Sequence, residues 1–439
     1  MTANHPVPSM QKEKLILIHS ISSLPKPGAL SKFTKTDTKN IARISEASDR
    51  ESVMENHPTI EEVFDAYFSC RKQKRNTLNQ LAFEVDLENN LLQLYRDLKA
   101  DNYKIGRSLA FVITHPKIRE VWAADFRDRV VHHIIYNALY ERFTKQFIRD
   151  TYACIPGRGT HDALRRVSGF ARSLTRNGTR TAYFLKADIA NFFNSIDKTR
   201  LLEILDKGIA PNEEWIRVLV HKIVLHNPRS NVVLRSSEEL FRQVPTHKSF
   251  MFAPPDRGLP IGNLVSQFFA NIYMNELDQF VKHRLKSRYY GRYVDDVILL
   301  HDSPTVLNEW YEAMSEFLAQ NLGLHFHPNK KHLNRIDTGM NFTGFIIKPG
   351  RTYLRNSSLS RCQQKIRAWE RRGAPLDEEN LEKLSMTVTS YLAMLRHVDG
   401  YKARHALCRR VENLFLQADE ECTKILPVKT PAAPARKKK

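Results

Sequence analysis

The chain has few cysteines and no long apolar run, and both absences narrow its class. Its five cysteines are scattered through 439 residues, with no C-x-x-C pair and no cysteines and histidines at zinc spacing. We therefore expect free, mostly buried thiols in a reducing cytoplasm. The N-terminus has no apolar stretch long enough for a signal peptide or a membrane span, so we expect no membrane partner.

Acidic residues are also scarce relative to basic ones. The sequence holds 68 Lys and Arg against 48 Asp and Glu, a formal net charge of +20. Such an excess attracts polyanions and releases their counterions on binding, so nucleic acid is the expected partner. Net charge alone is equally compatible with a solvated basic surface. The chain is 42% hydrophobic and too long for one ordinary domain, so we expect two or three subdomains.

Local patterns predict a mixture of helices and strands between two irregular ends. Residues 1–57 have weak periodicity and read as a partly flexible extension, and residues 425–439 read as a disordered basic tail. Thr59 and Glu62 form a capping-box pattern that predicts a helix start. Further helices are predicted near 87–98, 128–143, 201–205, 264–285, 357–372 and 384–410. Strands are predicted at 111–113, 120–122 and 182–187, with two more within 289–300.

Adjacent acids in an apolar run give the strongest functional signal. Asp295 and Asp296 follow Tyr293-Val294 and precede Val297-Ile298-Leu299-Leu300. Buried like charges repel and lose hydration, and a turn that presents both acids to one cation removes this cost. Asp188 supplies a third acid after the apolar strand that begins near Ala182. For most Asp pairs a solvated turn is the simpler interpretation, but the apolar flanks and the third acid argue against it here.

Three carboxylates on two strands can hold two magnesium ions. One ion lowers the pKa of a primer 3′-hydroxyl, and both stabilise charge on the attacking and leaving oxygens. The sequence therefore favours nucleotidyl transfer.

These residues resemble the reverse transcriptase family, from about Thr59 to about Cys422. Tyr293–Asp296 meet the family signature Y-x-D-D, and Asp188 meets its first metal-binding motif. The resemblance implies an α+β right-hand polymerase with fingers and palm at 58–354 and a helical thumb at 355–424, the palm being an antiparallel sheet with packed helices. It also implies two Mg²⁺ ions and the metal set Asp188, Ile189, Asp295 and Asp296, of which the three aspartates are catalytic.

The resemblance assigns further roles residue by residue. Phe193, five residues after Asp188, matches the aromatic steric gate that favours deoxynucleotides, although either neighbouring Phe could simply be a core residue. Arg119, and less surely Lys117, match the basic residues that grip the triphosphate; for Lys117 a solvated ribbon tip is nearly as good a reading. Lys330 matches a lysine near the leaving phosphate. Phe342 and Gly344 match the primer-grip hairpin.

The third motif departs from the common family pattern. Most members read Q-G-x-x-x-S-P, whereas this chain reads Ile261-Gly262-Asn263-Leu264-Val265-Ser266-Gln267. This version resembles the enzymes of diversity-generating retroelements and related bacterial lineages. It implies that Ile261, Gly262 and Gln267 lie at the incoming nucleotide. Losing the usual Gln implies less faithful copying.

Three functions compete on these observations: an RNA-templated DNA polymerase, an RNA-templated RNA polymerase, and a non-catalytic relic that binds RNA. The first is favoured because Asp188, Asp295, Asp296 and Phe193 are all present. The resemblance further implies a cytoplasmic bacterial enzyme of anti-phage defence, with mutagenic copying in a diversity-generating retroelement as the alternative. Its expected partners are template RNA, in particular a dedicated noncoding RNA, a DNA product and dNTPs. An accessory protein or a second copy of the chain could also take part.

Overall fold

The computed structural model describes residues 57–72, 77–115, 117–371, 377–414 and 416–427. The expected N-terminal extension and basic tail lie almost wholly outside these residues. The chain divides into two compact units, 1–103 and 104–439, which we describe separately. Within the described residues no helix is both long and apolar enough to cross a membrane. The boundaries predicted at 57, 354 and 424 stay predictions.

The first unit is helical, with α3 (Ile60–Arg71), α4 (Leu78–Glu84) and α5 (Leu87–Lys99). The capping box predicted at the start of α3 is confirmed, because Thr59 and Glu62 each bond the other's backbone N–H. The buried Glu84 carboxylate ties α4 to α3 by accepting from the Tyr67 hydroxyl at 3.0 Å and from Arg71 at 2.7 Å.

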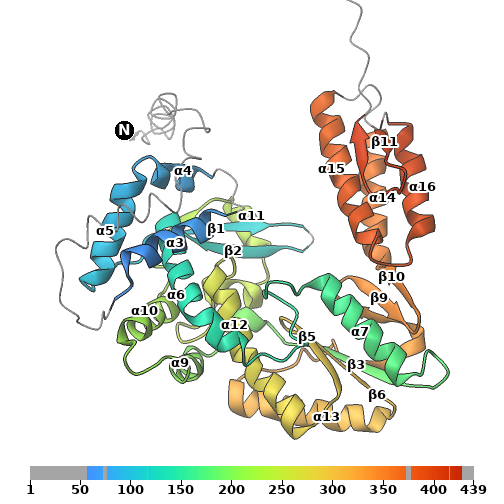
Figure 1. Cartoon of the computed structure of the whole chain (residues 1–439), viewed down its shortest axis with the longest axis horizontal. Coiled ribbons are helices and arrows are strands. Elements are labelled where there is room, and N and C mark those ends of the chain that lie inside the picture. The colour runs from blue at the N-terminus through green and yellow to red at the C-terminus, as the bar shows by residue number, and fades with distance from the viewer. Residues whose placement is uncertain (1–56, 73–76, 116, 372–376, 415, 428–439) are drawn as a thin grey trace, which may run out of the picture. The chain divides into compact units, whose positions relative to one another are not determined.

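The second unit contains three sheets and a small hairpin among many helices (Figure 1). Its strands are β1 (Ser108–Ile113), β2 (Arg119–Ala124), β3 (Tyr183–Asp188), β4 (Val232–Leu234), β5 (Tyr289–Tyr293), β6 (Asp296–His301), β7 (His332–Arg335), β8 (Met340–Phe342), β9 (Phe345–Lys348), β10 (Arg351–Leu354), β11 (Leu416–Ala418) and β12 (Ile425–Pro427). Its helices are α6 (Phe126–Thr144), α7 (Thr160–Leu174), α8 (Phe192–Ser195), α9 (Lys198–Asp206), α10 (Glu214–Leu225), α11 (Glu238–Arg242), α12 (Leu264–Gln279), α13 (Pro304–Phe317), α14 (Asn356–Glu370), α15 (Glu378–Leu395) and α16 (Tyr401–Glu412).

The central sheet has the order β5-β6-β3-β7, and every pairing in it is antiparallel. Alternate residues of a strand share one face, so Lys186 and Asp188 lie on the same face as Phe184. On that face Phe184, Ile298 and Leu300 join a core cluster with α7 and β8–β10, and this cluster continues into α14–α16. The α+β class and the two strands predicted within 289–300 are confirmed.

The C-terminal part differs from prediction in two places. The helix predicted over 384–410 is two helices, α15 and α16, with a break before Gly400. A Cβ on Gly400 would lie 2.6 Å from the Leu395 carbonyl oxygen, and Asp399 N–H donates to Thr352 at 3.0 Å. The thumb expected to be helical over 355–424 is helical only as far as Glu412, and the β11–β12 hairpin follows it. The break coincides with the bonds between Asp399 and Thr352 of β10, a contact distant in sequence that periodicity could not show.

Candidate active site

The register of the central sheet brings the predicted acids together. Asp188, the last residue of β3, lies directly opposite Asp296, the first residue of β6. Asp295 precedes it in the β5–β6 turn, where Val294 adopts a φ of 57°, and the Asp295 carbonyl accepts from Ile189 N–H at 3.3 Å. The three acids therefore come from the ends of two paired strands, as the sequence predicted.

The acids repel one another in this arrangement. Burial, followed by the charges of Asp188 and Asp296, raises the pKa of Asp295 to about 7. Burial also raises the pKa of Asp296, and the nearby Lys186 ammonium opposes that rise. The cluster thus holds more negative charge than its surroundings neutralise, which is the electrostatic condition that favours cation binding.

Two lysines partly compensate this charge. Lys330 forms an ion pair with Asp188, and Lys186 lies 3.1 Å from Asp296. Lys330 reaches the site because its segment runs beside β3: His327 N–H donates to the Asp188 carbonyl at 2.7 Å, and Ala190 N–H donates to the His325 carbonyl at 2.9 Å. Sequence reasoning missed Lys186, although its two-residue spacing from Asp188 places both on one face of the strand.

The donor set suits a hard divalent cation. Its side-chain ligands would be carboxylate oxygens from Asp188, Asp295 and Asp296, and oxygen donors are what Mg²⁺ prefers. Among the described residues, no three acidic, His or Cys side chains already lie at metal-holding distances. The two lysine contacts give a physical reason, because ammonium groups occupy oxygens that an ion would take. Ile189, also expected in the set, is buried and could offer only its backbone.

A buried ion pair supports the β5–β6 turn. Arg292 and Asp278 are both fully buried, and the guanidinium donates to the Asp278 carboxylate at 2.6 and 2.8 Å. Arg292 also donates to the Val294 carbonyl at 2.9 Å, which fixes the left-handed turn residue. Asp278 further accepts from the Tyr290 and Thr151 hydroxyls at 2.7 and 2.9 Å. The arginine was visible in the sequence as the one cation of an apolar run, but its partner on α12 was not.

The predicted gate residue lies beside the third motif. Phe193 belongs to the short helix α8 that follows Asp188, and it is half-buried while Phe192 is buried. The Phe193 carbonyl accepts from Leu259 N–H, and the Ile196 carbonyl accepts from Gly258 N–H, both at 2.8 Å. Residues 257–259 are therefore held against α8.

The third motif is also bonded to the finger strand β2. The Ile261 carbonyl accepts from Trp122 N–H at 2.7 Å, and the Asn263 amide bonds the backbone on both sides of Ala123. Gly262 has a φ of 123°, and a Cβ there would meet Val121 at 2.7 Å, so this position requires glycine. Gln267 is exposed on α12 and accepts from the Cys154 thiol at 3.3 Å.

The basic residues of the finger ribbon are exposed, as a ligand contact requires. Arg119 begins β2, and Lys117 lies in the turn that joins β1 to β2. The two predicted strands pair antiparallel, with Ile113 opposite Arg119, but the expected two-stranded ribbon is a three-stranded sheet because β4 pairs parallel with β1. The structure leaves both side chains on the surface, and their role at the triphosphate stays a prediction.

The predicted primer-grip hairpin exists as β8 and β9. Phe342 is fully buried in the core, whereas Thr343 and Gly344 form a turn with φ values of 48° and 91°. Any strand contact there would thus come through the turn. In the loop between α6 and α7, Arg158 donates to the Ile148 and Thr151 carbonyls at 2.8 and 3.1 Å, which gives this arginine a structural role.

Residues 115–347 match the family described as reverse transcriptase (RNA-dependent DNA polymerase). The chain therefore belongs to the reverse transcriptase family. The enzyme class expected from the sequence, an RNA-directed DNA polymerase and thus a nucleotidyltransferase, is confirmed by this match.

Two curated proteins are similar at low identity. Protein YkfC of Escherichia coli is 24% identical over 58% of this chain and 70% of its own length. An uncharacterised 91 kDa protein in the cob intron of Schizosaccharomyces pombe is 23% identical over 49% of this chain and 23% of its own length.

Among solved structures, telomerase from Candida albicans in complex with a fragment of telomeric RNA is 11% identical, with a TM-score of 0.45 over 71% of this chain. Apo telomerase from Candida tropicalis is 12% identical, with a TM-score of 0.42 over 56% of this chain. The chain spans about half the length of these telomerase chains, at 55% and 54%.

Proposed function

We propose that this chain copies RNA into DNA at the Asp188, Asp295 and Asp296 cluster with two Mg²⁺ ions. The observation that carries the proposal is the pairing of Asp188 with Asp296 beside Asp295, whose carboxyl has a pKa raised to about 7 by burial and by its two neighbours. Bound ions of this kind would activate the primer 3′-hydroxyl and stabilise the leaving pyrophosphate.

The chain's own residues have distinct tasks in this proposal. Asp188, Asp295 and Asp296 would hold the ions as carboxylates, Asp188 and Asp296 in place of their contacts with Lys330 and Lys186. Lys330, released from Asp188, carries its charge toward the leaving phosphate, where a cation stabilises developing negative charge. Arg292 holds the Val294 carbonyl, so that Asp295 stays in place during the exchange.

A primer-extension assay tests the proposal directly. Purified wild type is expected to extend a DNA primer on an RNA template with dNTPs and Mg²⁺. The double variant Asp295→Asn/Asp296→Asn should be inactive, and Asp337→Asn, which changes an exposed acid paired with Arg335, should retain activity. Incorporation by the double variant at the wild-type rate would overturn the proposal, and unchanged biological activity would favour the RNA-binding relic.

Sugar choice separates DNA synthesis from RNA synthesis. We propose that Phe193 closes the space a ribose 2′-hydroxyl would need, since it follows Asp188 by five residues and its own carbonyl is fixed by Leu259. Phe193→Val should raise incorporation of ribonucleotides relative to deoxynucleotides. Phe192→Val, a change of similar size at the buried neighbour, serves as the control. An unchanged sugar preference in Phe193→Val would remove the gate assignment.

The biological role is proposed on resemblance in sequence. We favour a bacterial anti-phage enzyme that copies a dedicated noncoding RNA, with mutagenic copying in a diversity-generating retroelement as the second candidate. The Ile261-Gly262-Asn263 motif favours the second candidate, because an apolar side chain replaces an amide beside the nucleotide. Ile261→Gln should lower the misincorporation rate if the motif relaxes fidelity, and equal error rates would contradict that. RNA that copurifies with the protein would identify the template.

A further inference from the structure

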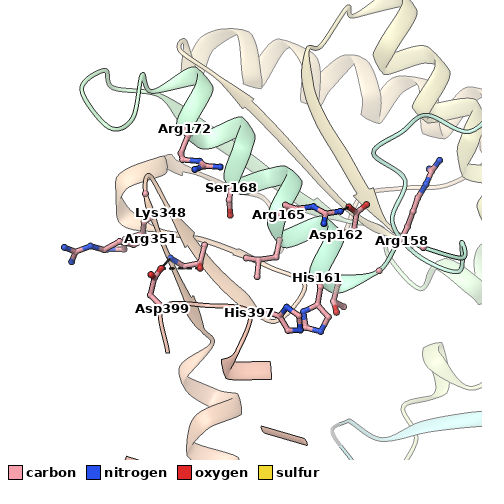
Figure 2. Close-up of a pocket in the computed structure, with 16 residues that line it drawn as sticks. Arg158, His161, Asp162, Arg165, Ser168, Arg172, Lys348, Arg351, His397 and Asp399 are labelled. Carbon is pink, nitrogen blue, oxygen red and sulfur yellow. Dashed lines mark hydrogen bonds and ion pairs between the residues drawn. The ribbon is translucent and has the colours of Figure 1, made fainter. Parts of the chain in front are cut away.

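A cationic cavity of about 700 Å³ lies between α7, the β9–β10 hairpin and the segment after α15 (Figure 2). None of the proposed catalytic or nucleotide-binding residues lines it. Five arginine and lysine side chains line it against two carboxylates, those of Asp162 and Asp399. Its volume is in the range of sites that hold a nucleotide-sized ligand.

Three of the five cations are available to a ligand. Arg158 is bound to backbone carbonyls and Arg165 to Asp162, the latter at 2.5 Å. Arg172, Lys348 and Arg351 make no ion pair with an acid in the described part of the chain. Arg172 comes from the C-terminal half of α7, and Lys348 and Arg351 come from the hairpin, with the Arg351 side chain directed away from α7 (Figure 2). Cations without an acidic partner recognise phosphate oxygens.

Two other features of the lining suit a nucleotide. The Ser168 hydroxyl oxygen is buried on the cavity side of α7 and has no hydrogen-bond partner among the described residues. A buried polar atom is costly without a partner, so a ligand that bonds it gains affinity. His161 and His397 stack with their ring centroids 3.7 Å apart, which offers a flat surface for a base.

The lining also joins two parts of the second unit. Asp399, which follows α15, accepts from Thr352 N–H at 2.7 Å, and its own N–H donates to the Thr352 carbonyl at 3.0 Å. These two bonds join the proposed thumb to β10 at the cavity wall. They fix the position of Asp399 relative to the β9–β10 hairpin.

We propose that this cavity, called the junction cavity below, binds a phosphate-bearing ligand of nucleotide chemistry apart from the polymerising centre. The ligand's phosphates would contact Arg172, Lys348 and Arg351. The phosphates can belong to a free nucleotide or to one residue of a nucleic-acid strand. This binding needs neither catalytic carboxylates nor magnesium, so it goes beyond the proposed polymerase activity and can fail or succeed independently of it.

Binding measured in EDTA tests the proposal on the full chain. The two probes are inorganic tripolyphosphate, followed by calorimetry, and a labelled trinucleotide RNA, followed by fluorescence anisotropy. The cavity variant is Arg172→Gln/Lys348→Gln/Arg351→Gln. The control variant, Lys207→Gln/Arg235→Gln/Lys248→Gln, loses the same charge at exposed positions outside the cavity. Matched thermal unfolding of both variants shows that each is folded.

The cavity variant should bind about tenfold more weakly or worse, because each charged hydrogen bond is worth roughly 1.5–3 kcal/mol, and the control should match wild type. Loss confined to tripolyphosphate identifies a free phosphate ligand. Loss that includes the trinucleotide identifies a strand. Equal affinity of wild type and cavity variant for both probes would overturn the proposal. An equal loss in the control variant, or no binding by wild type, would overturn it too.

Discussion

Two sets of ion pairs involve the central sheet near the β5–β6 turn, and they differ in how far water reaches them. Arg292 and Asp278 are each 0% exposed, whereas Lys330 is 43% exposed beside Asp188, and Asp296 is 31% exposed beside Lys186. A fully buried pair cannot lose one partner without leaving a charge in a medium that solvates it poorly. A partly exposed pair can, because water or a metal ion replaces the missing group.

The difference suggests that the two sets of ion pairs have separate roles at the β5–β6 turn. The buried pair fixes the backbone, through the bond from Arg292 to the Val294 carbonyl. The exposed pairs neutralise part of the charge on Asp188 and Asp296, the carboxylates proposed to hold the ions. One set should therefore govern stability, and the other activity and metal affinity.

Removing an acid from the exposed set should break activity most. Asp188→Asn is expected to lower the primer-extension rate by about 10³-fold, since a neutral amide holds a divalent cation poorly. Its unfolding free energy should change by less than about 1 kcal/mol, because Lys330 remains hydrated. Extension rates and urea unfolding on the same preparation check both statements, with Asp337→Asn as the matched control. A large loss of stability would show that the exposed pair is structural.

Removing one partner of the buried set should reverse that pattern. Arg292→Met is expected to destabilise the protein by about 3–5 kcal/mol, because Asp278 is left buried without its cation. Arg292→Met/Asp278→Asn should recover much of the loss, since Asn can still bond the Tyr290 and Thr151 hydroxyls. Urea unfolding of both variants measures this. If the single variant loses less than about 1 kcal/mol, Asp278 does not depend on Arg292.

The same comparison shows what the sequence could and could not predict. The β5–β6 hairpin and the strand before Asp188 follow from short runs of apolar residues around acids, so local pattern was enough. The partners Asp278 and Lys186 were not found, because each meets its counterpart only through the register of the sheet or the packing of α12. The junction cavity likewise joins residues as distant as Ser168 and His397. Such features depend on tertiary contact, which one sequence does not show.

His132 on α6 differs from both sets of ion pairs, because this buried side chain stays uncharged in the folded protein. Burial first, and then the charges of His133, Arg129 and His226, lowers the pKa of His132 to about 3. The unfolded chain therefore takes up a proton near pH 6.5 that the folded chain refuses. The contribution of neutral His132 to the free energy of unfolding is fully present above about pH 6.5. It falls by roughly 1.4 kcal/mol per pH unit between pH 6.5 and pH 3.

His132→Gln should remove this acid slope, whereas His115→Gln, at an exposed position of the finger ribbon, should keep it. Urea unfolding at about pH 7, 6 and 5 measures how the free energy of unfolding changes with pH in each protein. Parallel slopes in wild type and His132→Gln would show that other groups cause the acid lability.

The smallest effect is expected at Lys186. It shows whether this lysine competes with a metal ion for Asp296 or orients Asp296 for the ion. The ammonium lies 3.1 Å from Asp296, on the face that also carries Asp188. If it only holds the oxygen that a metal ion takes, Lys186→Met should lower the Mg²⁺ concentration for half-maximal extension by roughly severalfold, with a stability change under about 1 kcal/mol. Lys186→Arg, which keeps the cation, should stay near wild type. A higher Mg²⁺ requirement in Lys186→Met would mean that the lysine orients Asp296 for the ion, and the exposed set would then share the supporting role of the buried one.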